Sequence, residues 1–459
     1  MNDKKKLFET MAPGKALLIM ALPTVASQLI LLVYNIADTW FIGRTNDTNM
    51  VGASNLAVTI YMILASIANI FGVGGGSLMV RHIGEKRVED AKKVAIYSLF
   101  FSAITSAAFS VLSLILMTPL LYLLGARDLT LVYGKQYLLT TVVLGGIPTV
   151  LSMSMPQLLR NAGYAKEAGI GVALGSALNV VLDPIFMFVI LPKGNEVLGA
   201  GIATMLANAG SFVYFLFVFK KVQKESVLSL TFKPVRIEKE DKKSLYMVGI
   251  PAAISIFLFD LVIIVTNRLM VTYGDGVKPL AAFGIVSKIE RIPINVGLGV
   301  CLGMVPLIAY NFGARNYERM DRVSDLARRV ITGFALVCAL CFFFFAEPVV
   351  GAFIKDKDTV SLGAVLLQGR CFALPLMMVG YHVVNYMNAI NKGKVSFLSA
   401  IIRHIVLLVP ALVIMNSVWG LPGLIFAPVV ADSINAVVSI VIFAVVRKKC
   451  IKEVKNGTE

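Results

Sequence analysis

Long apolar stretches, separated by short polar segments, fill almost the whole chain. An apolar run of about 20 residues is long enough to cross a bilayer as a helix. Twelve such runs can be delimited, and they fall into two sets of six: 16–43, 50–80, 94–117, 132–158, 168–190, 198–219, 244–273, 279–310, 330–346, 360–388, 395–415 and 420–446. The pattern predicts an all-α integral membrane protein with twelve transmembrane helices.

The second half of the chain repeats features of the first half. The segment HIGEKRVEDAKKV at 82–94 matches NFGARNYERMDRV at 311–323, which places Lys86 against Arg315. The segment GIPTVLSMSMPQLLRNAG at 146–163 matches ALPLMMVGYHVVNYMNAI at 373–390. Both pairs indicate an internal duplication.

Two pseudo-symmetric lobes of six helices follow from this repeat. Because six is an even number, each half begins and ends on the same side of the membrane. The halves are then related by an axis along the membrane normal, as in transporters that rock two bundles about a central cavity. We predict an N-terminal lobe at 1–220, a cytoplasmic linker at 221–243 and a C-terminal lobe at 244–459.

The placement of the basic residues predicts the orientation of the chain. If the N-terminus is inside, 31 of the 43 Lys and Arg residues lie in cytoplasmic segments and 7 lie outside. This bias satisfies the positive-inside rule and puts both termini in the cytoplasm. The net charge of +16 therefore reflects topology and contact with the lipid bilayer. We expect no nucleic-acid partner.

Composition argues against an enzyme. The chain is 57% hydrophobic and 15% charged, with a mean hydropathy of +0.80. It has three histidines, no HExxH motif and no Cys/His spacing typical of a metal site. A nucleophile–base pair is also not visible. We expect no enzyme activity and no bound cofactor.

Asp38 is one of two acidic residues within the apolar segments of the first half. It lies in the segment Tyr34-Asn35-Ile36-Ala37-Asp38-Thr39, where Tyr34 and Asp38 share one helix face and Asn35 and Thr39 share the adjacent one. A charged side chain at the bilayer centre costs about 2.5–3.5 kcal/mol, so such residues face a cavity or a partner. The alternative is an interfacial Asp near the end of the first helix.

Asp183 is the second acidic residue of this kind. Asn179 and Asp183 lie one turn apart, and Pro184 removes the hydrogen bond to the carbonyl of Val180. Carboxylate, amide and carbonyl oxygens are ligands that suit a hard cation such as Na+. A carboxylate in apolar surroundings also suits proton uptake and release. Thr204 could add a hydroxyl, while the alternative is a proline kink with a structural Asp.

The second half carries a different set of polar groups. Lys288 and Arg291 share a helix face well inside the eighth apolar segment, so each requires a partner, for which Asp260 or Glu290 is the natural candidate. A structural ion pair and a functional relay are equally consistent with this pattern.

Prolines recur at matched places in the repeat. Pro23 and Pro251 lie in the first segment of each half, and Pro148 and Pro375 in the fourth. We expect these prolines to kink the spans.

Several segments together resemble the multidrug and toxic compound extrusion (MATE) transporters. They are QLILLVYNIADTWFIGR at 28–44, GGGSLMVRHIGEKR at 74–87, LLRNAG at 158–163, NVVLDPIF at 179–186 and VPLIAYNFGARNY at 305–317. The last two are most similar to the MepA-like bacterial branch of that family. The resemblance covers nearly the whole chain.

The resemblance implies a function as well as a fold. It implies twelve helices in two lobes that form a V, and export of amphipathic, often cationic drugs in exchange for H+ or Na+ across the bacterial inner membrane. The cation site of the family carries over to Asp38, Asn179, Asp183 and Thr204, with Asp38, Asn179 and Asp183 as the Na+ ligands if Na+ is the coupling ion. We expect a monomer.

The second lobe departs from the pattern of some relatives. Those relatives have an acidic residue in the seventh helix, near where Asp260 falls, and another in the tenth. The tenth segment here, 363–388, contains neither Asp nor Glu. We therefore do not expect a cation site in the second lobe of the kind those relatives have.

Other classes of membrane protein remain open from the residues alone. A major-facilitator transporter also has twelve helices in parallel halves. A lipid-linked saccharide flippase of the same superfamily would use a cationic cavity, for which Lys288 and Arg291 are candidates. A channel is also consistent with the spans, although the two-lobe repeat favours alternating access.

Our hypothesis is that a cation at Asp38 and Asp183 repositions the first helix near Pro23 and displaces the drug.

Overall fold

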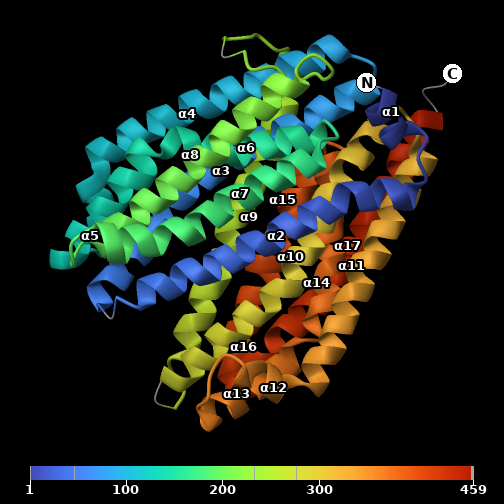
Figure 1. The fold of residues 1–459 in the computed structure, drawn as a ribbon. Coiled ribbons are helices and arrows are strands. Elements are labelled where there is room, and N and C mark those ends of the chain that lie inside the picture. Colours follow the sequence, from blue (N-terminus) through green and yellow to red (C-terminus); the bar gives the residue numbers. More distant parts are fainter. Residues whose placement is uncertain (1, 46, 232, 275–276, 456–459) are drawn as a thin grey trace. The chain divides into compact units, whose positions relative to one another are not determined.

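Helices make up every regular element that the computed structural model describes, which covers residues 2–45, 47–231, 233–274 and 277–455 (Figure 1). The first half forms α1 (Asn2–Glu9), α2 (Pro13–Gly43), α3 (Thr48–Gly84), α4 (Val88–Leu123), α5 (Asp128–Leu138), η1 (Leu139–Leu144), α6 (Gly146–Asn161), α7 (Ala165–Ile185), η2 (Phe186–Ile190) and α8 (Glu196–Val222). The second half forms α9 (Lys239–Met270), α10 (Val277–Gly313), α11 (Tyr317–Phe344), α12 (Ala346–Gly351), α13 (Lys357–Arg370), α14 (Ala373–Ala389), α15 (Gly393–Ile401), η3 (Ile402–Leu408), α16 (Val409–Trp419) and α17 (Leu421–Lys455). The segments η1, η2 and η3 are π-helical.

The membrane spans agree with the apolar pattern. Within the described residues, ten helices are long and apolar enough to cross a membrane, and two bent pairs raise the number to twelve if each pair is one span. The bends are 57° between Asp128–Leu144 and Gly146–Asn161, and 51° between Lys357–Arg370 and Ala373–Ala389. The predicted twelve-span, all-α class is confirmed, and the two bent spans are the fourth of each half, which carry Pro148 and Pro375.

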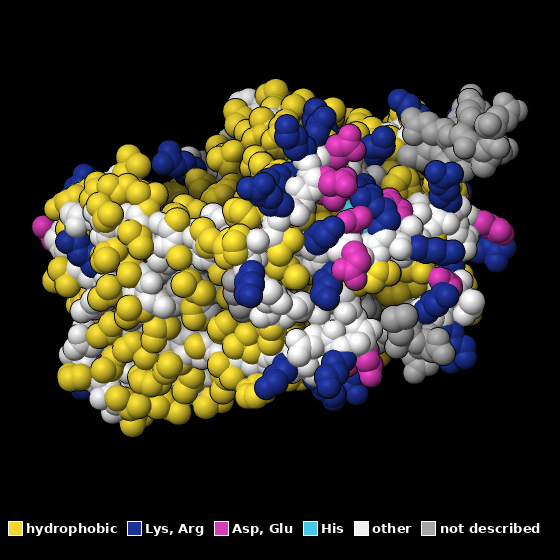
Figure 2. All heavy atoms as spheres, turned by 90° about the horizontal axis from the view of Figure 1, so that it is seen from above, with side chains coloured by type: hydrophobic (Ala, Val, Ile, Leu, Met, Phe, Trp, Pro, Cys, Tyr) yellow, Lys and Arg dark blue, Asp and Glu magenta, His cyan; other side chains and the backbone are white. Residues whose placement is uncertain are grey.

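Much of the surface is apolar, as expected for helices that face lipid. Ile115, Phe217 and Val189 are 70%, 70% and 77% exposed. Figure 2 shows broad apolar areas on one face, with Lys and Arg gathered among Asp and Glu in one part of it. An apolar surface of this extent suits a hydrocarbon environment and not water.

The chain divides into two compact units. One comprises Leu22–Ala253 together with the residues up to Met11, and the other comprises Ala12–Ala21 and the residues from Ile254 onward. The divisions fall inside α2 and α9, one residue before Pro23 and two residues after Pro251. The first turns of α9 thus belong to the first compact unit, and Ala12–Ala21, with the first turns of α2, belong to the second.

Glycines allow this packing of α9. The backbone of Gly249 contacts Ile70 so closely that an added Cβ would collide with the Ile70 carbonyl oxygen. A Cβ on Gly74 would collide with the carbonyl oxygen of Leu245. Small residues at such contacts let two helix backbones approach each other. The glycine run at 72–76 therefore serves helix packing.

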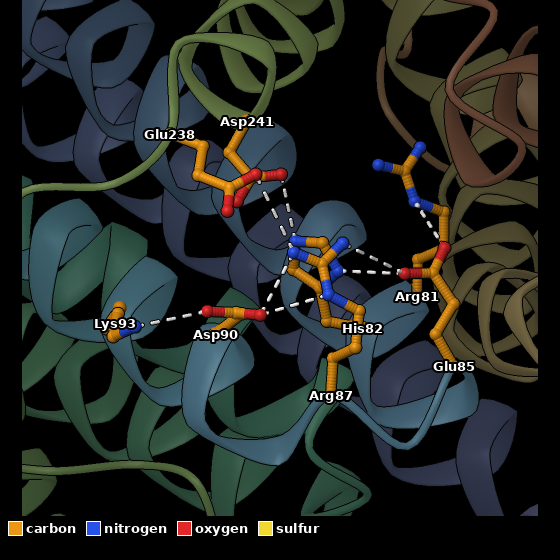
Figure 3. Close-up of polar contacts among 8 residues, drawn as sticks. All are labelled: Arg81, His82, Glu85, Arg87, Asp90, Lys93, Glu238 and Asp241. Carbon is orange, nitrogen blue, oxygen red and sulfur yellow. Dashed lines mark hydrogen bonds and ion pairs between the residues drawn. The ribbon is translucent and has the colours of Figure 1, made fainter.

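A polar network fixes the same end of α9 to the turn between α3 and α4 (Figure 3). The buried imidazole of His82 lies 3.0 Å from Glu85 Oε2 through Nδ1 and 3.0 Å from Asp241 Oδ1 through Nε2. The guanidinium of Arg87 donates from Nε to Asp90 Oδ2 at 2.9 Å. The linker therefore enters α9 at a fixed point of the first unit.

The internal repeat is visible in the backbone. Lys86 and Arg315, the residues that the sequence repeat aligns, both have positive φ, at 63° and 57°. Few residues other than glycine adopt this conformation, so its presence at the same place in both halves indicates the same tight turn. Each turn connects the second and third helices of its half.

Candidate functional site

The predicted polar cluster of the first half is assembled in the first unit. Asn179 and Asp183 lie on α7 and Thr204 on α8, and all three side chains are almost fully buried. The Asn179 side chain donates from Nδ2 to Thr204 Oγ1 at 3.2 Å. The sequence hypothesis that these residues lie together therefore agrees with the geometry.

Asp38 completes the cluster from α2. Asp38 and Asp183 belong to the same compact unit, and the charge of Asp38 is felt at Asp183. The Oδ1 atom of Asp38 is buried and accepts no hydrogen bond from any described residue. Two acidic groups of different helices thus share one region of the first unit.

Three tyrosines lie around Asp38, and two of them were not predicted from the sequence. Tyr34 of α2, Tyr61 of α3 and Tyr137 of α5 all lie within electrostatic range of Asp38. The Tyr137 phenol is also hydrogen-bonded to the side chain of Thr204. We expected only Tyr34, because Tyr61 and Tyr137 lie in other helices and no local pattern connects them to Asp38.

Asn208 of α8 adds an amide that we did not predict from the sequence. Its Nδ2 donates to the Tyr61 hydroxyl at 3.2 Å and to Thr149 Oγ1 at 3.1 Å. Asn208 follows Thr204 by four residues, so both share one face of α8. The spacing matches that of Asn179 and Asp183 on α7, and this signal could have revealed it.

The residues predicted to support the site, Asn35, Pro23 and Pro184, differ in their surroundings. Asn35 is exposed, and its carbonyl oxygen accepts a hydrogen bond from Thr39 Oγ1 at 2.8 Å. Pro23 lies inside α2, near the boundary between the compact units. Pro184 lies inside α7, which continues past it and passes into η2. π-Helical turns within α-helices are frequent at functional sites.

The cluster offers oxygen ligands and not a transition-metal site. Carboxylates of Asp38 and Asp183, an amide and a hydroxyl are the groups that bind a proton or a hard cation such as Na+. Among the described residues, no group of three or more His, Cys, Asp or Glu side chains could hold a metal ion. The donor set thus consists of oxygen atoms, which suit a proton or a hard cation.

The candidates of the second half are not brought together as a set. Glu290 accepts two hydrogen bonds from Arg370, from Nε at 3.0 Å and from Nη2 at 3.1 Å. We had expected Lys288 or Arg291 as its partner. Arg291 lies over the ring of Phe259, with Cζ 5.8 Å from the ring centroid. Lys288 makes no ion pair with a described residue, and the side chain of Asp260 lies outside the described part of the chain.

A second buried ion pair lies near Glu290 in the second unit. Arg403 of η3 donates from Nε to Asp432 Oδ1 at 2.6 Å and from Nη2 to Oδ2 at 3.1 Å. The two residues lie on neighbouring spans, 29 positions apart. Pairing of this kind is what keeps charged residues within a membrane-spanning bundle.

Fold and sites define the class of the protein. Membrane-spanning helices in duplicated halves, with buried acids facing polar partners, are typical of secondary transporters. The MatE family model matches residues 23–185 and, a second time, residues 251–414. The chain therefore belongs to the MATE family and is a membrane transporter, not an enzyme. This membership confirms the resemblance and decides against a major-facilitator transporter.

Individual relatives match over nearly the full length. The chain is 28% identical over 451 residues to "Multidrug export protein MepA" of Staphylococcus aureus (strain MSSA476), with 98% of this chain and 97% of that protein covered. It is 26% identical over 448 residues to the protein of the same name from Staphylococcus saprophyticus, with the same shares covered. A solved structure described as "MATE in complex with MaL6" has a TM-score of 0.91 at 23% identity, with 98% of this chain and 100% of that chain covered. The last likeness shows the fold.

Proposed function

We propose that this protein exports amphipathic, often cationic drugs in exchange for an inward-moving cation, H+ or Na+. Membership of the MATE family and the near full-length similarity to two multidrug export proteins support the drug as cargo. The observation that carries the coupling ion is the burial of Asp183 beside the hydrogen-bonded pair Asn179 and Thr204, with a second acid, Asp38, in the same unit.

A cation bound between these two acids removes their mutual repulsion. Like charges repel each other more strongly in a protein interior than in water, so neutralising one of the two acids changes the balance of forces on both helices. Asp38 lies on α2, the helix that contains Pro23. Cation binding is thereby linked to the position of α2, and a change in α2 releases the drug.

The membrane potential adds to the driving force. An inward-moving cation gains about 2.3 kcal/mol per elementary charge for each 100 mV. The predicted topology has both termini in the cytoplasm and the protein in the inner membrane of a bacterium. The distribution of 31 basic residues against 7 and the bacterial relatives support this placement.

Dye efflux from proteoliposomes tests the proposal. A fluorescent cationic dye is followed under a pH gradient or a Na+ gradient imposed separately, for wild type, Asp38→Asn and Asp183→Asn. We expect transport under one gradient and its loss in both variants. Export at the wild-type rate by Asp183→Asn would disprove the role of the acidic pair.

Asp128→Asn provides the matched control. Asp128 is exposed at the start of α5 with a φ of 42°, a conformation that Asn tolerates well. This variant removes one acid from the first unit without touching the cluster. It should transport like wild type.

A further inference from the structure

A cavity of about 90 Å³ lies within the second unit, lined by residues of α9, α10, α13, α14, η3, α16 and α17. Much of its wall is apolar, with Phe259, Phe283, Ile294 and Met377 among the lining residues. Sites that enclose a whole drug-sized ligand have about 300–1,000 Å³. This cavity is therefore large enough for one end of such a molecule.

The acidic residues of the wall are already neutralised. Glu290 receives two hydrogen bonds from Arg370, and Asp432 receives two from Arg403. Paired N–H groups of a guanidinium match the two oxygens of a carboxylate in geometry and charge. Neither acid is therefore available to attract a cationic ligand.

His404 adds no charge to the cavity in this arrangement. Its Nε2 lies 3.0 Å from Arg403 Nη1, and its Nδ1 lies 2.9 Å from the carbonyl oxygen of Ala400. A guanidinium only donates and a carbonyl only accepts, so Nε2 must accept and Nδ1 must carry the proton. The imidazole is thus neutral and orients Arg403.

Arg291 is the remaining charged group of the wall. It lies over the Phe259 ring and makes no ion pair with any described residue. The described ionisable groups that line the cavity are three arginines, two acids and a neutral histidine, which leaves one positive charge in excess. Arg291 is half-buried, and a charge that is partly removed from water without an acidic partner attracts an anionic group.

We propose that this cavity is a subsite for the carboxylate of an acidic or zwitterionic amphipathic substrate, with Arg291 as the residue that binds it. The guanidinium of Arg291 donates two N–H groups to the carboxylate, a geometry that lysine cannot reproduce. Phe259 and Phe283 contact the ring or chain that carries the acid. The inference rests on the proposed function in that it names a class of substrate for this transporter.

Binding of two matched dyes tests the subsite. One xanthene dye carries a free benzoic acid and is a zwitterion at pH 7, and the other is its ethyl ester and is a cation. Fluorescence polarisation measures the Kd of each for the protein in lipid nanodiscs. Hydrogen bonds to a charged group contribute about 1.5–3 kcal/mol, so wild type should prefer the acid about 10–100-fold.

Three variants give the comparison. Arg291→Gln should bring the ratio of the two Kd values to about one while the ester still binds, and Arg291→Lys should retain part of the preference. Lys288 lies one turn before Arg291 on the same helix but does not line the cavity. Lys288→Gln therefore removes a nearby cation and should leave the ratio of the two Kd values unchanged. If Arg291→Gln does not fold, Arg291→Lys tests the proposal through the partial loss of the preference for the acid.

Two results would overturn the proposal: equal binding of both dyes by wild type, or an unchanged preference in the Arg291 variants. Failure of the proposed function has a different signature. In that case reconstituted wild type moves neither dye across the membrane, whatever the ratio of the two Kd values.

Discussion

His82 and Asp241, 159 positions apart, are joined by a contact of 3.0 Å between Nε2 and Oδ1. The other ring nitrogen of His82 lies 3.0 Å from Glu85. A neutral imidazole donates from one nitrogen only, so both hydrogen bonds form to ionised carboxylates only when the ring carries two protons. The contact fastens the first turn of α9 to the end of α3, and its strength can be measured.

Replacing His82 by leucine should lower the stability of the protein. The change leaves the buried carboxylate of Asp241 without this partner, and loss of one partner of a buried pair typically costs about 3–5 kcal/mol. Thermal unfolding in nanodiscs measures the effect. Lys93→Gln, which breaks an exposed ion pair with Asp90, should cost less than about 1 kcal/mol. Equal effects of the two variants would contradict a buried pair at His82.

Glu85 should make stability depend on pH. Burial acts to raise its pKa, but the His82 hydrogen bond and the positive charge of Arg81 outweigh it and lower the pKa below its usual value. A pKa that is lower in the folded state stabilises the protein above the unfolded pKa of about 4.3. That stabilisation is lost as the pH falls through the folded pKa.

The pair of wild type and Glu85→Gln measures this dependence. Their difference in Tm should be present at pH 7 and should vanish once the pH lies below the folded pKa. Glu89→Gln, at an exposed position without an ion pair to a described residue, should have little effect across the range. A difference in Tm between wild type and Glu85→Gln that grows towards low pH would contradict a lowered pKa of Glu85.

Replacing Thr204 by valine should weaken binding of the coupling cation. The change removes the hydroxyl that accepts from Asn179 and bonds with Tyr137. Loss of one or two hydrogen bonds of about 0.5–1.5 kcal/mol each should raise the cation concentration for half-maximal efflux about 3–100-fold. Thr39→Val is the control, because among the described residues its hydroxyl bonds the Asn35 carbonyl alone, on the same exposed helix face. A Thr204 variant indistinguishable from this control would remove Thr204 from the site.

Alanine at Gly249 and at Gly284 should have opposite effects. The Gly249 Cβ would collide with backbone atoms of Ile70, and overpacking of this kind costs about 1–3 kcal/mol. A Cβ on Gly284 meets nothing within 4 Å, so alanine there should add about 0.5–1 kcal/mol of helix stability. Thermal unfolding of the two variants gives the comparison, and stabilisation by Gly249→Ala would refute the close approach of α9 and α3.

Sequence alone predicted the spans well, because each apolar run must satisfy its backbone polar groups within its own helix. The repeat placed Lys86 against Arg315, and both have positive φ. Local spacing also brought Asn179 and Asp183 to one face of α7. These are short-range features, and helical geometry determines them.

Contacts between helices were harder to predict. Tyr61 and Tyr137 approach Asp38 from α3 and α5, and Glu290 pairs with Arg370 at a separation of 80 residues. Apolar helices can rotate about their axes at little cost until specific side chains meet, so hydropathy carries no information on which polar groups will pair. Only the packed structure decides between Arg291 and Arg370 as the partner of Glu290.

The π-helical segments have a consequence for the family's sequences. A π turn closes its hydrogen bond over five residues where an α turn uses four. A helix can therefore take in or lose one residue there and keep both of its ends in place. Among relatives of this chain, single-residue insertions and deletions inside the spans should gather at Phe186–Ile190 and Ile402–Leu408, the stretches next to Asp183 and around Arg403.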